Sequence, residues 1–251
     1  MPIYSTSTCP AGSVVCQGSD DGTWGKRVMA AKRKIRLSHP GRGCRRTGIR
    51  PVREQVHLCV EGLSEDQYVR ALLDLRYPGL FTPAFIGQKG RKQGRKTSLV
   101  NLVNAVRRAK REKPRELREV TIWIVGDVDQ NDVHREYLED WRAESKWHRS
   151  VLQAVGIEGW ILQHFDKPDR CSSVSEAERI LKKRWTGYVK GCEFPEWLIN
   201  RTAQACGRER QFLGSRDNSG VWPVDRSSQM PALIEYLDER AARKGWKPPQ
   251  V

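Results

Sequence analysis

Strand-length apolar runs alternate with helix-length amphipathic segments along the middle of this chain. The apolar runs cover residues 55–60, 81–86, 120–125 and 151–155. The third run, VTIWIV, is continuous, β-branched and aromatic, which makes it the strongest strand signal in the chain. Between the runs, apolar residues recur at helical spacing in segments near 64–75, 99–113 and 132–148. This order predicts an α/β fold, in which a parallel sheet of about four strands is flanked by helices.

The two ends of the chain differ from this middle part. After residue 158 the pattern is mainly helical, with helices expected at 159–165, 174–185, 194–206 and 231–243. Before residue 54 there is no sustained period, and residues 26–53 hold eleven basic residues and no acidic one. We therefore predict three parts: a flexible basic arm at 1–53, an α/β core at 54–158, and a helical extension at 159–251 that packs on the core.

Composition narrows the class of protein further. Lys and Arg total 45 against 30 Asp and Glu, and the net charge of +15 favours nucleic acid as a partner. The hydrophobic fraction is 38%, and no apolar run is long enough for a transmembrane helix, so we expect no membrane association. The seven cysteines contain no C-x-x-C pair, which favours free thiols in a reducing cytoplasm over a zinc site. These features predict a cytoplasmic location.

Acidic residues follow two of the predicted strands. Glu61 comes directly after the first, and Asp127 and Asp129 follow the third. In an open parallel sheet the functional crevice lies at the carboxyl ends of the strands. With one residue between them in extended backbone, Asp127 and Asp129 face the same side and repel each other unless a cation lies between them. The pattern predicts a Mg²⁺ or Mn²⁺ site, and the alternative is a polar loop without a ligand.

A basic loop follows the second predicted strand, at the same edge of the sheet. It spans residues 87–96, and its cations are Lys89, Arg91, Lys92, Arg95 and Lys96. Cations beside a metal site can hold a nucleic-acid backbone, so we predict that this loop binds nucleic acid. A solvated loop without a ligand is the alternative.

Three segments of the chain, in this order, read CVEGLSEDQY (residues 59–68), VGDVD (125–129) and EGWILQHF (158–165). They resemble motifs of the RloB-like family, whose members have a Toprim fold. The first segment is similar to the family opening C-E-G-x-x-T-E-x-x-Y/F. Ser64 replaces the usual Thr, and with Gln67 it has capping-box spacing, so we expect its hydroxyl to cap the first helix. Residues 125–129, VGDVD, resemble the family strand that ends in D-x-D. Residues 158–165, EGWILQHF, are similar to the segment F-E-x-W-L-L-x-H-F.

The likeness continues towards the C-terminus, with one departure. Residues 188–190 look like a later Y-x-K element, and residues 227–237 look like the closing helix. The family usually has an S-N-P-type turn before the F-E-x-W segment, where this chain has QAVGI at 153–157. The resemblance covers roughly residues 55–240 and leaves the basic arm outside it.

The resemblance implies roles for individual side chains. Glu61 and Asp127 would be the principal metal ligands, and Asp129 would be a second or water-mediated ligand. Glu65 and Glu158 would complete a second metal position, although an acidic residue such as Glu65 in a first helical turn is also favoured by the helix dipole alone.

For two further residues, both a catalytic role and a role without chemistry are open. His164 would act as a base or substrate contact, since histidine titrates near neutral pH, or it would be a hydrogen-bonded packing residue. Lys190 would approach the scissile phosphate together with Tyr188, or it would belong to a solvated face.

The activity that this resemblance implies is Mg²⁺-dependent cleavage of phosphodiester bonds in RNA, with tRNA as a candidate, or in DNA. Relatives are effectors of bacterial anti-phage systems, commonly encoded beside an ABC- or SMC-like ATPase, so nucleic acid and such an ATPase are the expected partners. The altered turn favours an alternative, a non-catalytic nucleic-acid-binding or regulatory partner of the ATPase. A primase-like nucleotidyl transferase, which would use the same carboxylates, and assembly into a homo-oligomer also stay open.

Overall fold

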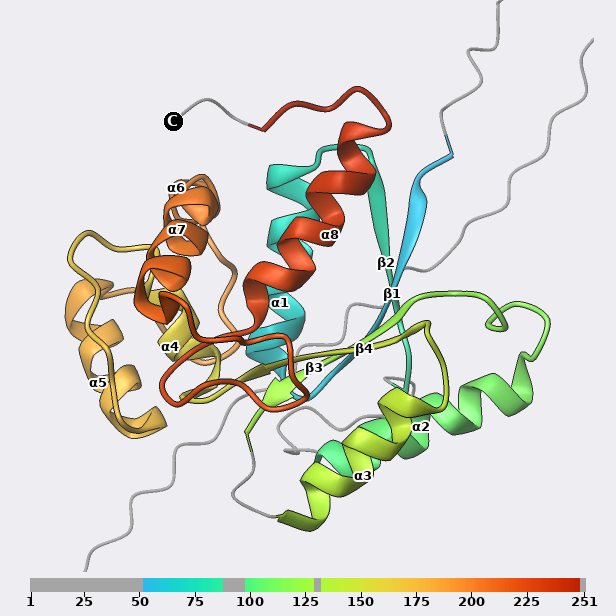
Figure 1. Cartoon of the computed structure of the whole chain (residues 1–251). Helices are drawn as coiled ribbons and strands as arrows, with labels where there is room; N and C mark the ends of the chain where they lie inside the picture. The colour runs from blue at the N-terminus through green and yellow to red at the C-terminus, as the bar shows by residue number, and fades with distance from the viewer. Residues whose placement is uncertain (1–51, 88–97, 129–131, 249–251) are drawn as a thin grey trace, which may run out of the picture. The chain divides into compact units, whose positions relative to one another are not determined.

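Four parallel strands form the sheet at the centre of the fold (Figure 1). They lie in the order β2-β1-β3-β4, with bounds β1 (Glu54–Val60), β2 (Phe81–Phe85), β3 (Ile122–Asp127) and β4 (His148–Gln153). All neighbours are parallel, so the carboxyl ends of the strands share one edge. The predicted α/β class with about four parallel strands and flanking helices is confirmed, and it is consistent with a Toprim-like fold.

The structure is a computed structural model that describes residues 52–87, 98–128 and 132–248. These residues belong to one compact unit that runs from Arg50 to Val251. Most of the predicted basic arm, residues 1–51, lies outside the described residues. Within the described part, no helix has the length and apolar character needed to cross a membrane.

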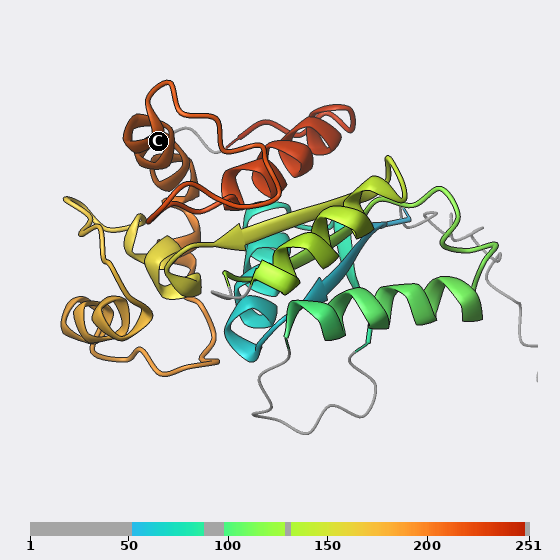
Figure 2. The ribbon, with the colours of Figure 1, turned by 60° about the horizontal axis from the view of Figure 1, so that its bottom comes forward.

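One face of the sheet packs on two amphipathic helices. They are α2 (Leu99–Glu112) and α3 (Asp132–Ala143), which lie together on one side of the strands in Figure 2. Cys59, Ile122 and Ile124 point to this side and join the apolar residues of both helices in one core cluster. Alternation along β3 then sends its other side chains to the opposite face.

The second face carries the larger core and positions the candidate site. It is covered by α1 (Leu63–Ala71), α4 (Gly156–Leu162) and α8 (Met230–Ala242), which pack with Trp123 and Val125 of β3. The remaining helical elements are a π-helical turn that continues α1 (η1, Leu72–Arg76), α5 (Val174–Arg184), α6 (Glu196–Ile199) and α7 (Thr202–Leu213). The predicted mainly helical C-terminal part is therefore confirmed.

Several predicted boundaries are wrong by a few residues. Strand β3 was expected to end at Val125, but it continues through Gly126 and Asp127 because these two residues pair with Leu152 and Gln153 of β4. For the same reason β4 begins at His148, inside the segment predicted to be helical. The single helix expected at 194–206 is two helices, α6 and α7, with a break at residues 200–201.

The predicted cap at Ser64 is also wrong. Helix α1 starts two residues earlier than a cap at Ser64 implies, with the extended residue Gly62 as its N-cap and no side-chain cap. The carbonyl of Gly62 accepts the first hydrogen bond, from the Asp66 amide. The Ser64 hydroxyl instead accepts a hydrogen bond of 3.1 Å from the Gly191 amide, so it joins α1 to the segment that carries Lys190.

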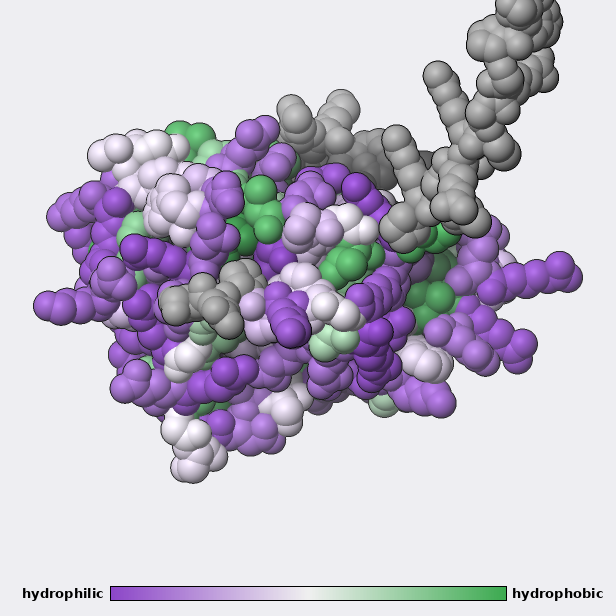
Figure 3. All heavy atoms as spheres, turned by 90° about the horizontal axis from the view of Figure 1, so that it is seen from above, coloured by the Kyte–Doolittle hydropathy of each residue, from purple (hydrophilic) through white to green (hydrophobic). Residues whose placement is uncertain are grey.

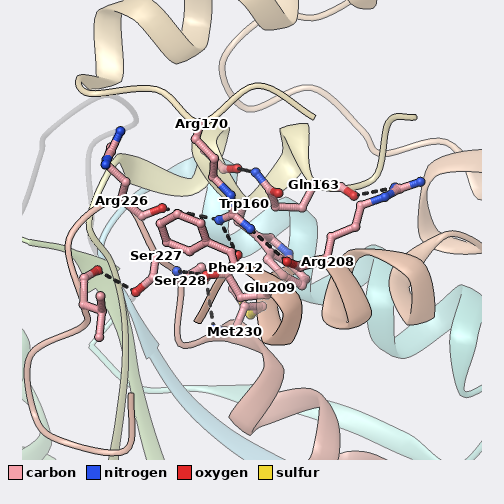
Figure 4. Close-up of polar contacts among 12 residues, drawn as sticks. Trp160, Gln163, Arg170, Arg208, Glu209, Phe212, Arg226, Ser227, Ser228 and Met230 are labelled. Atoms are coloured by element: carbon pink, nitrogen blue, oxygen red, sulfur yellow. Dashed lines mark hydrogen bonds and ion pairs between the residues drawn. The ribbon is translucent and has the colours of Figure 1, made fainter. Parts of the chain in front are cut away.

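A buried ion pair fixes the C-terminal helices to the loop before α8 (Figure 4). The Glu209 side chain on α7 is fully buried and accepts a hydrogen bond of 2.7 Å from Arg170 and one of 2.9 Å from the Ser228 amide. The Arg170 guanidinium also lies 4.0 Å from the ring centroid of Phe212. The backbone of Ser228 in turn pairs with Gln153, so this network supports the end of β4.

The surface agrees with the polar composition. The face in Figure 3 is mainly hydrophilic, with small apolar patches between charged side chains. Large apolar side chains that are exposed in the described part are Val52, Leu63, Leu75, Val189 and Trp197.

Candidate metal centre at the carboxyl edge of the sheet

Glu61 and Asp127 meet where two neighbouring strands end. Glu61 follows β1, and its amide donates a hydrogen bond of 2.9 Å to the Val125 carbonyl, which extends the pairing of β1 with β3. The Glu61 carboxylate accepts a hydrogen bond of 2.8 Å through Oε2 from the Asp127 amide. Glu61 is only 2% exposed, so a buried carboxylate lies directly against the backbone of Asp127. Parallel pairing thus unites residues that lie far apart in the sequence.

Two glycines leave room for these carboxylates. A Cβ atom on Gly126 would lie 2.8 Å from Glu61 Oε2, which is too close for a normal contact. Gly156, with φ +65°, begins α4, and a Cβ atom there would lie 3.0 Å from Glu158 Oε2 and 3.4 Å from Asp127 Oδ2. The carboxylates of Glu158 and Asp127 therefore approach the same small space, which side chains at either glycine would fill.

Glu65 adds a fourth carboxylate from the first turn of α1. It is 4% exposed, and burial is the main cause that raises its pKa to about 7. The negative charges of Glu61 and Glu158 raise the pKa further, while hydrogen bonds from the backbone amides of Gly62 and Glu65 oppose the rise. Glu61, Glu65, Asp127 and Glu158 are called the acid cluster below.

Tyr188 and Lys190 line one side of the acid cluster. The Tyr188 hydroxyl donates a hydrogen bond of 2.7 Å to Glu158 Oε1, and burial together with this carboxylate raises the Tyr188 pKa. Lys190 Nζ lies 4.0 Å from Glu158 Oε1 and forms a closer ion pair with Glu178 of α5. The Lys190 side chain is 60% exposed, so its charge faces solvent at the rim.

Sequence reasoning missed two residues here. Gln153, the last residue of β4, pairs in register with Asp127 and is 1% exposed, yet both polar atoms of its carboxamide lack a hydrogen-bond partner in the described part of the chain. A neutral Gln in a short apolar stretch gives no sequence signal, and only its position at the strand end could have suggested it. Glu178 was missed because it looks like an ordinary charge on the polar face of α5.

His164 lies elsewhere, inside the core. It is fully buried, its Nδ1 lies 3.2 Å from the Ile161 carbonyl, and its Nε2 lies 3.3 Å from the Tyr68 hydroxyl. Burial lowers the His164 pKa to about 3, so the ring is neutral at physiological pH. This placement matches the packing interpretation of His164 and separates it from the residues that meet at the sheet edge.

Two predicted groups lie outside the described residues. These are Asp129 and the cations of the basic loop, Lys89, Arg91, Lys92, Arg95 and Lys96. Their roles as a metal ligand and as nucleic-acid contacts stay predictions.

The acid cluster fits a divalent cation by its chemistry. Its donors are hard carboxylate oxygens, joined by the carboxamide of Gln153, and buried like charges are stabilised by a cation or a proton. In the described part of the chain, no three His, Cys, Asp or Glu side chains stand ready as a closed set of ligands. Mg²⁺ commonly binds through only one or two carboxylates and completes its shell with water or substrate phosphates, so a closed set is not required.

Comparison with known proteins places this chain in a family. A family model described as RloB-like protein matches residues 57–237, which is well over half of the chain. The chain belongs to the RloB-like family. The matched region begins in β1 and ends in α8, so it contains the second half of β1, the other three strands and the whole acid cluster. No curated protein and no solved structure matches this RloB-like chain.

Proposed function

We propose that this RloB-like protein is a Mg²⁺-dependent endonuclease that cleaves RNA or DNA. The observation that carries the proposal is the meeting of Glu61, Asp127 and Glu158 at one edge of the sheet, in a space kept open by Gly126 and Gly156. A net charge of +15 suits a polyanionic substrate, although the carboxylates at this edge would repel it without a cation. The combination of buried carboxylates with a large positive net charge therefore favours a metal-dependent reaction on nucleic acid.

The position of each residue at the sheet edge suggests its role in the reaction. Glu61 and Asp127 would hold the cation, with Gln153 and Glu158 beside them. A bound divalent cation would neutralise phosphate oxygens and lower the pKa of a water molecule. Lys190, exposed at the rim, would contact a phosphate oxygen as a point charge. Glu65, with a pKa of about 7, would gain or release a proton close to neutral pH.

The biological setting that we propose is anti-phage defence, with an ABC- or SMC-like ATPase as partner. It follows from the resemblance of residues 59–68 and 158–165 to family effectors. Because such a partner would control the activity, the test must include it.

Cleavage by the purified protein tests the proposal. The full chain is incubated with tRNA and with plasmid DNA, in Mg²⁺ or in EDTA, with and without the ATPase encoded nearby. We expect Mg²⁺-dependent cleavage that Asp127→Asn lowers by about a hundredfold or more, because a charge that stabilises the transition state is lost. Asp140→Asn is the matched control, since Asp140 is exposed on α3.

One observation favours a second function, a non-catalytic partner of the ATPase. Members of the acid cluster already have protein contacts, since Glu61 accepts from the Asp127 amide and Glu158 accepts from Tyr188. Such contacts also suit a structural role. Nucleic-acid binding without cleavage in every condition, unchanged by Asp127→Asn, would support this second function and contradict the first.

A further inference from the structure

A second site lies near the amino-terminal ends of β3 and β4, between α8 and the edge strand β4. A cavity of about 330 Å³ opens there to solvent. Its walls include Trp123 of β3, Arg149 and Ser150 of β4, Arg142 of α3, and Tyr236 and Glu239 of α8. Trp123 lies four positions before Asp127 on the same strand, which places the cavity about 13 Å along β3 from the acid cluster. The two sites are therefore distinct.

Two arginines without acidic partners line this cavity. Neither Arg142 nor Arg149 has a carboxylate within 4.0 Å in the part of the chain that the structure describes, and the hydrogen bond that Arg149 donates goes to the His148 carbonyl. Burial and the charge of Arg149 lower the pKa of Arg142. Two guanidinium groups so close to each other are stabilised by an anion that both can contact.

Buried donors accompany these arginines. Trp123 is 4% exposed and Ser150 is 8% exposed, and the indole N–H and the hydroxyl have no hydrogen-bond partner among the described residues. The donors that the wall formed by β3, β4 and Arg142 presents to the open cavity are therefore the guanidinium groups of Arg142 and Arg149.

The α8 side of the cavity carries acidic side chains, Glu235 and Glu239. Glu235 forms an ion pair of 2.6 Å with Arg210, whereas Glu239 has no cation within 4.0 Å in the described part. The ring of Tyr236 lies 5.3 Å from that of Trp123, so aromatic surface separates the arginines from Glu239. A ligand that spans the cavity needs an anionic end, a flat or apolar middle, and hydroxyl or amino donors at its other end.

We propose that this cavity binds a small phosphate ester of mononucleotide size. Arg142 and Arg149 hold the phosphate, Trp123 and Tyr236 contact the apolar part, and Glu239 accepts hydrogen bonds from ribose hydroxyls or a base amino group. This site takes a free ligand and requires no cation, so it stands independently of the nuclease proposal.

Isothermal titration calorimetry with 5′-AMP, adenosine and inorganic phosphate tests the proposal. The full chain is used in EDTA and moderate salt, which removes any contribution from the acid cluster. We expect 5′-AMP to bind more tightly than either fragment. Arg142→Gln and Arg149→Gln should each weaken binding about tenfold or more, because each removes a charge-assisted contact to phosphate.

Control variants make the result decisive. Arg135→Gln, which removes a surface arginine from α3 that already pairs with Glu139, should bind 5′-AMP like the wild type. Circular dichroism and thermal melting confirm that each variant is folded. Absence of 5′-AMP binding by the wild type, binding that survives both cavity variants, or equal affinity for 5′-AMP and inorganic phosphate would each overturn the proposal.

Discussion

Buried carboxylates occur in two very different settings in this protein. Glu209 is fully buried, but Arg170 and the Ser228 amide satisfy it, so its charge is balanced within the fold (Figure 4). In the acid cluster, Glu61, Glu65 and Glu158 are almost as deeply buried, and the negative charges of Glu61 and Glu158 act on Glu65. In the pair of Glu209 with Arg170, each charge compensates the other, whereas the acid cluster holds like charges whose repulsion a cation or a proton would relieve.

Removing the balanced charge should have the largest effect on stability. Glu209→Gln leaves the partly buried Arg170 guanidinium without its counter-ion, and we expect the free energy of unfolding to fall by about 3–5 kcal/mol. Urea denaturation measures the loss. The matched control is Glu235→Gln, which breaks the exposed pair with Arg210 and should cost less than about 1 kcal/mol. Similar losses in both variants would mean that Glu209 is not a buried anchor.

Mg²⁺ should stabilise the acid cluster and leave the Glu209 pair unaffected. At a concentration a hundredfold above its dissociation constant, Mg²⁺ should raise the free energy of unfolding by about 2.7 kcal/mol. Asp127→Asn should abolish this gain because it removes a ligand charge, whereas Asp140→Asn should keep it. Thermal melts with and without Mg²⁺ provide the measurement, and an equal gain in both variants would place the bound ion elsewhere.

The pH dependence of stability should reveal the repulsion in the metal-free protein. The pKa of Glu65 is raised from 4.5 to about 7, so between these values the folded state binds more protons than the unfolded state. Stability is therefore lost as the pH rises through 7, by on the order of 1 kcal/mol between pH 6 and pH 8. Glu65→Gln should flatten this dependence in EDTA. An unchanged slope in that variant would show that Glu65 is not the group that titrates.

The smallest expected effect on stability belongs to Gln153. Its carboxamide makes no hydrogen bond in the described part of the chain. Apart from the loss of packing, Gln153→Ala should therefore lower the free energy of unfolding, measured by urea denaturation, by less than about 1 kcal/mol. The same variant should weaken Mg²⁺ binding or cleavage by about tenfold or more if the amide supports the ligands of the cation. Gln163→Ala is a matched control, because Gln163 is also buried but lies beyond the acid cluster at the end of α4.

Local patterns predicted much of the fold and part of the site. The apolar run at 120–125 had to become a central strand, and the acids that follow strands had to reach the carboxyl edge of a parallel sheet. The pattern failed at the end of β3, where pairing with Leu152 and Gln153 decides how far the strand continues. It also failed at Ser64, because the competing partner of its hydroxyl, the Gly191 amide, lies 127 positions away.

The sequence by itself determined the α/β class, the order of the strands along the chain and the positions of Glu61 and Asp127 at strand ends, because side-chain period and strand polarity are local properties. Only the tertiary structure decided which carboxylates meet, that His164 is buried and neutral, and that Arg142 and Arg149 share a cavity with α8. Burial and charge proximity depend on contacts between distant segments, and such contacts exist only once the chain has folded.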